Sequence, residues 1–374
     1  MSDTQLPEPD RLDGAPHPRE TAQLFGQDAA QADFLQAFTS DRLHHGWLIT
    51  GPRGVGKATL SWRIARFLLA TPLDQDDGLF GAPPPPTDLE IDPEHPVAHR
   101  LLAGSEPGLF ALKRPYDDKA KRLKAQITVD EVRKLKNFFA LSATDGGRRV
   151  VIVDAADDMN VNAANAILKL LEEPPARTTL LLVSHQPSRL LPTIRSRCRE
   201  LRLDPLSSED LSRALQAAGI DASDADPNAL AALSGGSIGE AVRLLQQDGL
   251  ELYEDIVKLF STLPDLSRPH AIALAESAAG RGKENRLDLV LTLLDRALAR
   301  LARTGAMGAA PEPPTSPAEA ETFLRLCPSQ HAAQKWAHLA QTEGDKLRHG
   351  RAVNVEAGSL LLSSFLALRD GCPR

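Results

Sequence analysis

Aromatic side chains, cysteines and long apolar runs are all scarce in this sequence of 374 residues. Aromatic residues make up 4% of the chain, so its hydrophobic cores must be filled mainly by Leu, Ala, Val and Ile. No stretch approaches the roughly 18 consecutive apolar residues of a membrane-spanning helix. The sequence therefore predicts neither a membrane span nor a membrane partner.

The three cysteines, Cys198, Cys327 and Cys372, are odd in number and far apart. They predict neither a disulfide framework nor a CxxC zinc site, and they favour a reducing compartment. Residues 1–19 are acidic and polar, without the basic start and apolar run of a secretory signal. We therefore expect a cytoplasmic protein.

The charge balance excludes a further class of protein. The formal net charge is −7, so the chain as a whole is not a basic protein that wraps nucleic acid. Any contact with DNA must come from a local patch or from a partner. The hydrophobic fraction of 42% and the charged fraction of 25% are those of an ordinary soluble globular protein.

Strand and helix patterns alternate over roughly the first 200 residues. Short apolar runs predict five strands, at residues 47–50, 109–112, 150–153, 179–184 and 200–203. We also expect a helix over 20–40, an irregular insertion over 71–107 and a basic loop over 113–124. Such alternation predicts a parallel sheet with helices on both faces.

The chain is longer than one hydrophobic core usually supports, so we expect several domains. Beyond Asp204 the pattern changes to helices only. The predicted parts are a flexible arm (1–20), an α/β nucleotide-binding domain (21–204), a small helical lid (205–248) and an all-helical domain (249–374).

A phosphate-binding loop follows the first predicted strand. Residues 51–57, Gly-Pro-Arg-Gly-Val-Gly-Lys, match G-x-x-x-x-G-K between a strand and a helix. Gly51, Gly54 and Gly56 let backbone N–H groups close around phosphate oxygens, and Lys57 reaches the outer phosphates. The plainer alternative is a glycine-rich turn without a ligand.

The loop lacks its usual metal ligand. The residue after the lysine should be Ser or Thr, whose hydroxyl holds Mg²⁺, but here it is Ala58. Thr59 does not substitute for it, because one step along a helix rotates the side chain by about 100°. The sequence therefore predicts a loop that holds metal poorly.

A second group needed for hydrolysis is also missing. Asp154 ends an apolar run, where P-loop folds place a carboxylate near the metal. The glutamate that would then orient water is replaced by Ala155. Asp157 and Asp158 come one turn later, and we expect them to cap the next helix. Hydrolysis in this site is therefore not expected.

A basic cluster lies at residues 191–199. From charge alone, the expected role of such a cluster is a solvated helix end. Cys198 within it is expected to be a small buried hydrophobe rather than a reactive thiol.

Several motifs resemble those of AAA+ clamp loaders. Ser196-Arg197-Cys198 resembles their S-R-C signature, and residues 170–175, Leu-Leu-Glu-Glu-Pro-Pro, resemble their L-E-E-P-P segment. Residues 160–168 and Arg42-Leu43-His44-His45 also look like this family. The resemblance runs in order over residues 18–203.

This resemblance implies an AAA+ P-loop domain, a lid and a helical collar that joins five subunits in a ring. It also implies that Arg197 acts in trans, as an arginine finger on a neighbouring subunit's ATP. Ala58, Ala155 and Gly239, which stands where active members carry a nucleotide-sensing arginine, make the chain similar to delta-prime subunits of bacterial DNA polymerase III. Ser184 stands where a polar sensor is usual.

The implied partners are the motor (gamma/tau) and delta subunits, the sliding clamp and the backbone of primed DNA. Such a chain would help the motor subunits load the clamp during replication. No cofactor is required, and weak binding of ATP or phosphate by the loop is left open. Some relatives carry a four-cysteine zinc module, but residues 71–107 lack cysteine and Pro96 separates His95 from His99. We predict no metal.

Three alternatives stay open. One is a self-sufficient AAA+ ATPase of the motor type, which Ala58, Ala155 and Gly239 disfavour. Another is a nucleotide kinase, which would need an acceptor pocket and a basic lid. The third is a purely structural subunit without a functional arginine.

Overall fold

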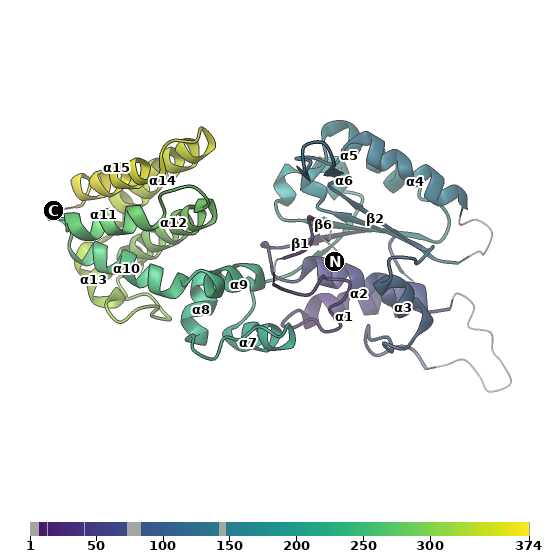
Figure 1. Ribbon diagram of the computed structural model, residues 1–374. Coiled ribbons are helices and arrows are strands. Elements are labelled where there is room, and N and C mark those ends of the chain that lie inside the picture. The colour runs from purple at the N-terminus through teal and green to yellow at the C-terminus, as the bar shows by residue number, and fades with distance from the viewer. Residues whose placement is uncertain (1–6, 13, 41, 73–83, 142–146, 374) are drawn as a thin grey trace, which may run out of the picture. The chain divides into compact units, whose positions relative to one another are not determined.

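The computed structural model describes residues 7–12, 14–40, 42–72, 84–141 and 147–373 (Figure 1). The chain forms two compact units. The first comprises the residues up to 221 together with 237–239, and the second comprises 222–236 and the residues from 240 onward. No described helix is both long and apolar enough to span a membrane.

The first unit is built on a five-stranded parallel sheet with the order β2-β5-β6-β1-β7. Its strands are β1 (Gly46–Thr50), β2 (Leu109–Lys113), β5 (Arg149–Asp154), β6 (Thr178–Ser184) and β7 (Arg199–Arg202). All five predicted strands are confirmed. Their apolar runs are continuous because helices cover both faces of the sheet.

The helices of this unit form a layer on each face (Figure 1). They are α1 (Asp28–Thr39), α2 (Lys57–Ala70), α3 (Pro96–Leu102), α4 (Val129–Leu141), α5 (Val161–Glu172) and α6 (Pro192–Arg195), and α7 (Ser208–Ala217) follows the last strand outside these layers. The core beside α1 and α2 is separate from the core beside α4 and α5. This arrangement confirms the predicted α/β fold, a parallel sheet with helices on both faces.

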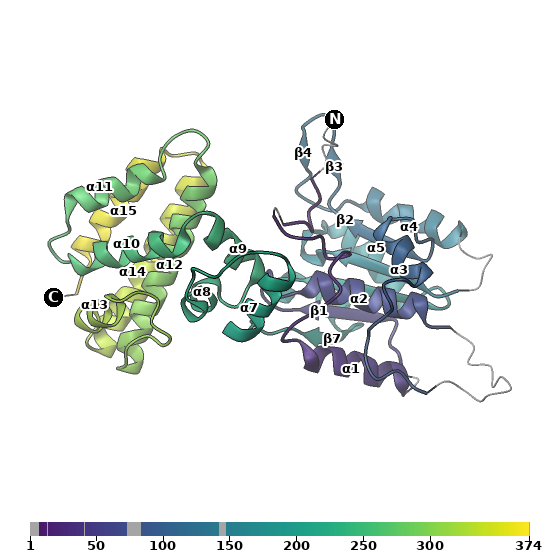
Figure 2. The ribbon, with the colours of Figure 1, turned by 60° about the horizontal axis from the view of Figure 1, so that its bottom comes forward.

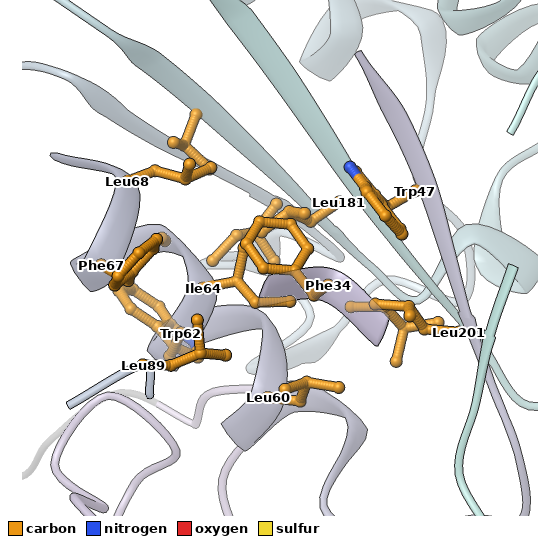
Figure 3. Close-up of a cluster of buried hydrophobic side chains, with 14 of the residues drawn as sticks. Phe34, Trp47, Leu60, Trp62, Ile64, Phe67, Leu68, Leu89, Leu181 and Leu201 are labelled. Carbon is orange, nitrogen blue, oxygen red and sulfur yellow. The ribbon is translucent and has the colours of Figure 1, made fainter. Parts of the chain in front are cut away.

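Side chains of β1 alternate between the two cores, as in any strand. Trp47 and Ile49 belong to the core beside α1 and α2, and Leu48 belongs to the other. Figure 3 shows Trp47 beside Phe34 of α1, with ring centroids 5.0 Å apart. Ile64 of α2 is fully buried in the same cluster. This packing fixes α2, and with it the loop that precedes α2, against the sheet.

The second unit is helical, as predicted beyond Asp204. Its helices are α8 (Pro227–Ser234), α9 (Ile238–Gln246, whose first two residues belong to the first unit), α10 (Gly249–Ser261), α11 (Arg268–Ser277), α12 (Glu284–Met307), α13 (Glu319–Leu326), α14 (Gln330–Ala352) and α15 (Ala357–Asp370). The long helices α12 and α14 pack against each other. The boundaries between three domains stay a prediction.

Two local predictions are wrong. The helix predicted over 20–40 begins only at Asp28, because Gly26 has a left-handed backbone with a φ of +66° that no α-helix contains. The basic loop predicted over 113–124 contains a short antiparallel hairpin of β3 (Tyr116–Asp117) and β4 (Arg122–Leu123), visible in Figure 2. Paired strands satisfy backbone groups that a loop would leave to water.

The predicted irregular insertion over 71–107 also contains regular structure. Helix α3 begins at Pro96, which is tolerated there because the first turn of a helix needs no bond from that backbone nitrogen. His95 precedes this helix and accepts a bond from its backbone, so Pro96 did not exclude a helix as the sequence suggested. Residues 73–83 of the insertion lie outside the described ones.

The described part of the predicted N-terminal arm is packed onto the first unit. His17 is fully buried, with its ring edge-on to Trp62 at 5.9 Å. The guanidinium of Arg66 on α2 donates to the carbonyl of Arg19 at 2.8 Å. This packing could not be predicted from the sequence, because acidic and Pro-containing segments usually stay solvated.

Candidate functional site

The phosphate loop lies between β1 and α2, as its motif predicts. Lys57, the first residue of α2, is buried, and its ammonium group donates to two carbonyls of its own loop. One is the carbonyl of Gly51, at 2.8 Å, and the other is that of Pro52. Burial lowers the pKa of Lys57 to about 8, although the carboxylates of Asp154 and Asp157 oppose this shift.

A second segment closes onto the same loop. The backbone N–H of Ile238 donates to the carbonyl of Gly54 at 2.9 Å. A Cβ atom at Gly54 would lie 2.1 Å from the hydroxyl of Ser237, and the φ of Gly54 is +75°. Only glycine fits a position with this φ and this close approach. Gly239, where the resemblance implies a missing sensor arginine, has its backbone nitrogen 3.0 Å from the same point.

Asp154 lies at the end of β5, at the edge of the sheet where the carboxyl ends of the strands meet. Burial, together with the carboxylate of Asp10, raises the pKa of Asp154 to about 7, although the Lys57 charge opposes the shift. A carboxyl that is half protonated at neutral pH is a weak ligand for Mg²⁺, because binding requires its ionised form.

Asp157 and Asp158 were expected to cap the next helix, and that expectation is wrong. The carboxylate of Asp157 accepts from the hydroxyl of Ser184 at 2.7 Å and from the backbone N–H of His185. The cap of α5 is Asn160, whose side chain accepts from the first turn. Asp158 pairs with Arg114 at 3.0 Å. Ser184 and Asp157 meet because the ends of neighbouring parallel strands lie at one edge of a sheet.

The N-terminal arm contributes an ionic cluster beside Asp154 that the sequence did not reveal. The ammonium of Lys113, in register with Asp154 on the neighbouring strand, lies 2.7 Å from Glu8 and 3.0 Å from Asp10. Nε2 of His17 lies 3.2 Å from Asp10. Although burial raises it, the His17 hydrogen bond and the Lys113 charge lower the pKa of Asp10 to about 2.

This cluster has the ligand types of a metal site, but its bonding argues against one. Nδ1 of His17 accepts the backbone N–H of Arg19 at 3.0 Å, so a neutral ring carries its proton on Nε2, the atom that faces the carboxylates. A ligating nitrogen needs a free lone pair and usually a donor on the opposite ring nitrogen. The Lys113 ammonium already binds the carboxylate oxygens, so the cluster fastens the arm to β2.

Arg197 lies two residues after the end of α6. Its side chain is 38% exposed. One terminal nitrogen, Nη2, lies 2.9 Å from Glu172 Oε1, and the other, Nη1, donates to the carbonyl of Thr193 at 3.1 Å. The guanidinium is therefore held on one side and open to water on another.

The motifs that resemble clamp loaders meet next to this arginine. Nε2 of His45 lies 2.9 Å from the carbonyl of Leu171. A Cβ atom at Gly46 would lie 2.7 Å from the Leu171 side chain and 3.2 Å from the carbonyl of Arg197. Cys198 is half-buried against the core beside α4 and α5, and burial raises the pKa of its thiol to about 12, as expected of a residue that is not a reactive thiol.

Comparison with known proteins supports the motif assignment. The model of the family described as "DNA polymerase III, delta subunit" matches residues 26–207. The DNA polymerase III subunit delta' of Pseudomonas aeruginosa is 41% identical over 219 residues, which are 57% of this chain and 60% of that protein. That of Bacillus subtilis is 31% identical over 226 residues, 60% of each chain.

More distant relatives include the tau subunit of Salmonella typhimurium, 29% identical over 292 residues that cover 76% of this chain and 41% of that protein. A solved gamma subunit-related protein from Thermotoga maritima covers 90% of this chain and 99% of that one, at 15% identity and a TM-score of 0.43. This chain spans about three-fifths of the length of the delta' relatives it matches. Over its first two hundred or so residues, the chain is thus similar to the family described as "DNA polymerase III, delta subunit" and to the delta' subunits of DNA polymerase III.

Proposed function

We propose that this chain is a non-hydrolysing clamp-loader subunit that donates Arg197 to ATP bound on a neighbouring subunit. The observation that carries the first half is the bonding of Lys57. Its ammonium donates to the carbonyls of Gly51 and Pro52, so a nucleotide phosphate would have to displace both bonds. Two of the three N–H donors of this buried ammonium are already satisfied internally, so it has less to gain from that exchange.

The groups around the loop support the same reading. Ala58 has no hydroxyl for a metal, and Ala155 is buried without a carboxylate to orient water. The pKa of Asp154 near 7 leaves half of this carboxyl neutral at physiological pH. Segment 237–239 packs on Gly54, where the loop backbone would otherwise surround phosphate oxygens.

Arg197 supports the second half of the proposal. A guanidinium presents donors in a planar fork that spans two phosphate oxygens, and it stays charged at any physiological pH. Two of its five N–H donors are used by Glu172 and Thr193, and the side chain is partly exposed. An arginine finger supplied in trans typically raises turnover by roughly 10³–10⁵-fold at the site that receives it.

The partners follow from the same assignment. The chain would assemble in the cytoplasm with motor (gamma/tau) and delta subunits, and help them open the sliding clamp and place it on primed DNA. Contact with DNA would be to the phosphate backbone and therefore strongly dependent on salt.

A self-sufficient ATPase of the motor type is the competing function. It would need a metal-binding hydroxyl beside Lys57 and a carboxylate beside Asp154, and the chain has Ala58 and Ala155 at these positions. A nucleotide kinase would need an acceptor pocket and a basic lid beside the loop.

The test is ATP hydrolysis by a loader reconstituted with its other subunits, clamp and primed DNA. Arg197→Ala should abolish the contribution of the site that receives this arginine, while the complex still assembles. Arg195→Ala is the matched control, because Arg195 is exposed two residues away and carries the same charge. Unchanged turnover with Arg197→Ala in an intact complex would mean that the chain is a structural subunit.

A further inference from the structure

Glu172, the last residue of α5, is the one charged side chain bound to Arg197 among the described contacts. We propose that Glu172 is a positioning residue: it holds the guanidinium of Arg197 in the orientation that a neighbour's phosphate requires. This inference rests on the proposed function, because it presumes that Arg197 acts in trans.

The bond geometry suits positioning. Glu172 Oε1 binds Nη2 at 2.9 Å, and the carbonyl of Thr193 binds Nη1 at 3.1 Å. These contacts use one N–H of each terminal nitrogen, so the Nε–H and the second N–H of each nitrogen can bind a phosphate without displacing either contact. Glu172 therefore does not have to release Arg197 for the arginine to act.

Orientation matters for a finger residue because arginine has a long, flexible side chain. In water the guanidinium samples many rotamers, and a phosphate that bound it would have to select one. A carboxylate and a carbonyl that hold two of its edges remove much of this freedom in advance. Preorganisation of this kind raises turnover without adding a contact to the substrate.

Glu172 can set a position only if it is itself held in place. The carbonyl of Leu171, one residue earlier, binds Nε2 of His45 at 2.9 Å. Leu171 is buried and packs on Gly46 at the start of β1. The backbone carbonyl of Arg197 also packs on Gly46. Both partners of the Glu172–Arg197 pair are thus fastened to the first residue of the same central strand.

The chemistry also explains why a carboxylate is tolerated near an incoming phosphate. The Glu172 side chain is 42% exposed, so water and salt screen its repulsion of another anion. What remains is a short directional bond. An amide oxygen accepts such a bond as a carboxylate does, and this gives a conservative variant for the test.

The experiment compares variants of the full chain in the reconstituted loader, with the turnover number and the ATP concentration for half-saturation measured separately. Glu172→Ala should lower turnover at the receiving site by roughly 10- to 100-fold, because a misplacement of about 1 Å can cost that much. Half-saturation should hardly change, since Arg197 acts on the transition state. Glu172→Gln should keep most of the activity.

Glu173→Ala is the matched control. It removes the same charge from the next residue, which is also exposed. Equal effects of Glu172→Ala and Glu173→Ala would overturn the proposal, and so would faster turnover with Glu172→Ala, which would mean that the carboxylate withholds the arginine. The double variant Glu172→Ala/Arg197→Ala should be no slower than Arg197→Ala alone.

A loader that contains Arg197→Ala distinguishes failure of the positioning role of Glu172 from failure of the proposed function. If Arg197→Ala lowers turnover and Glu172→Ala does not, positioning fails and the finger assignment stands. If Arg197→Ala itself leaves turnover unchanged, the proposed function fails and positioning fails with it.

Discussion

The phosphate loop (51–57) and the surroundings of Arg197 belong to the same α/β unit, yet their charged side chains differ in burial and in bonding. At the loop, the ammonium of Lys57 is buried and bound to carbonyls of its own chain. Arg197 is partly exposed; its guanidinium contacts Glu172 and the carbonyl of Thr193, and its remaining N–H donors are not used by these contacts. The proposed function rests on this contrast: Lys57 is bound within its own loop, whereas Arg197 has N–H donors left to bind another group.

The phosphate loop is enclosed by packing as well as by the bonds of Lys57. Segment 237–239 approaches Gly54 so closely that no side chain fits there. Near Arg197 the tight contact is between Gly46 and Leu171, and it leaves the guanidinium partly exposed. A change at the loop should therefore alter stability, and a change at Arg197 should alter activity.

Gly54→Ala should produce the largest effect on stability. The new Cβ would lie 2.1 Å from the hydroxyl of Ser237, at a φ of +75°. Left-handed backbone and overpacking together should lower the free energy of unfolding by about 3 kcal/mol. Urea unfolding measures this change.

Gly104→Ala is the control for that variant. Gly104 has a similar φ, +67°, but a Cβ there meets nothing within 4 Å. It should lose only the conformational part, about 1–2 kcal/mol. Equal losses at the two glycines would mean that segment 237–239 does not close the loop.

Asp154→Asn should change how stability depends on pH. An unfolded chain releases this proton near pH 3.9, whereas the folded chain keeps it up to about pH 7. Between these values the folded state binds more protons, so raising the pH lowers the free energy of unfolding, by at most about 1.4 kcal/mol per pH unit. The Asn variant should lack this slope.

His185 makes the comparison with wild type necessary. Burial and the charge of Lys57 lower the pKa of His185 to about 4, so its contribution to stability is lost as the pH falls from about 6.5 towards 4. This slope opposes that of Asp154 and is present in both proteins, so it cancels in their difference. Parallel stability curves for the two proteins would contradict a raised pKa at Asp154.

Arg197→Ala should have the smallest effect on stability. Its pair with Glu172 is exposed on both sides, at 38% and 42%, and such pairs contribute less than about 1 kcal/mol. Thermal unfolding of the isolated chain should therefore hardly change. A loss of several kcal/mol would mean that Arg197 has a structural role, and any loss of loader activity could then not be assigned to the finger.

The elements that the sequence predicted best are those set by local patterns. All five strands, the loop after β1 and the helical region beyond Asp204 follow from apolar runs, glycine spacing and periodicity. The hairpin within 113–124 and the packed arm escaped prediction. They depend on contacts such as that of Lys113 with Asp10, between residues far apart in a chain whose local composition is polar.

The site divides in the same way. The motifs predicted Lys57, Asp154 and Arg197 as site residues, and the positions of these residues follow from the strands and helices they adjoin. Which groups each charged side chain binds, and whether it is buried or exposed, could not be predicted from the sequence. These properties depend on the backbone carbonyls at Gly51 and Pro52, and on a pairing between α5 and the segment after α6 that no spacing rule describes.

The most direct test sets the phosphate loop against Arg197 in the reconstituted loader. Arg197→Ala and Lys57→Met are compared for ATP hydrolysis stimulated by clamp and DNA, with assembly verified for both. We expect a large loss with Arg197→Ala and turnover close to wild type with Lys57→Met, since in the proposed function Lys57 takes no part in hydrolysis. A large loss with Lys57→Met and none with Arg197→Ala would show that this chain hydrolyses ATP itself.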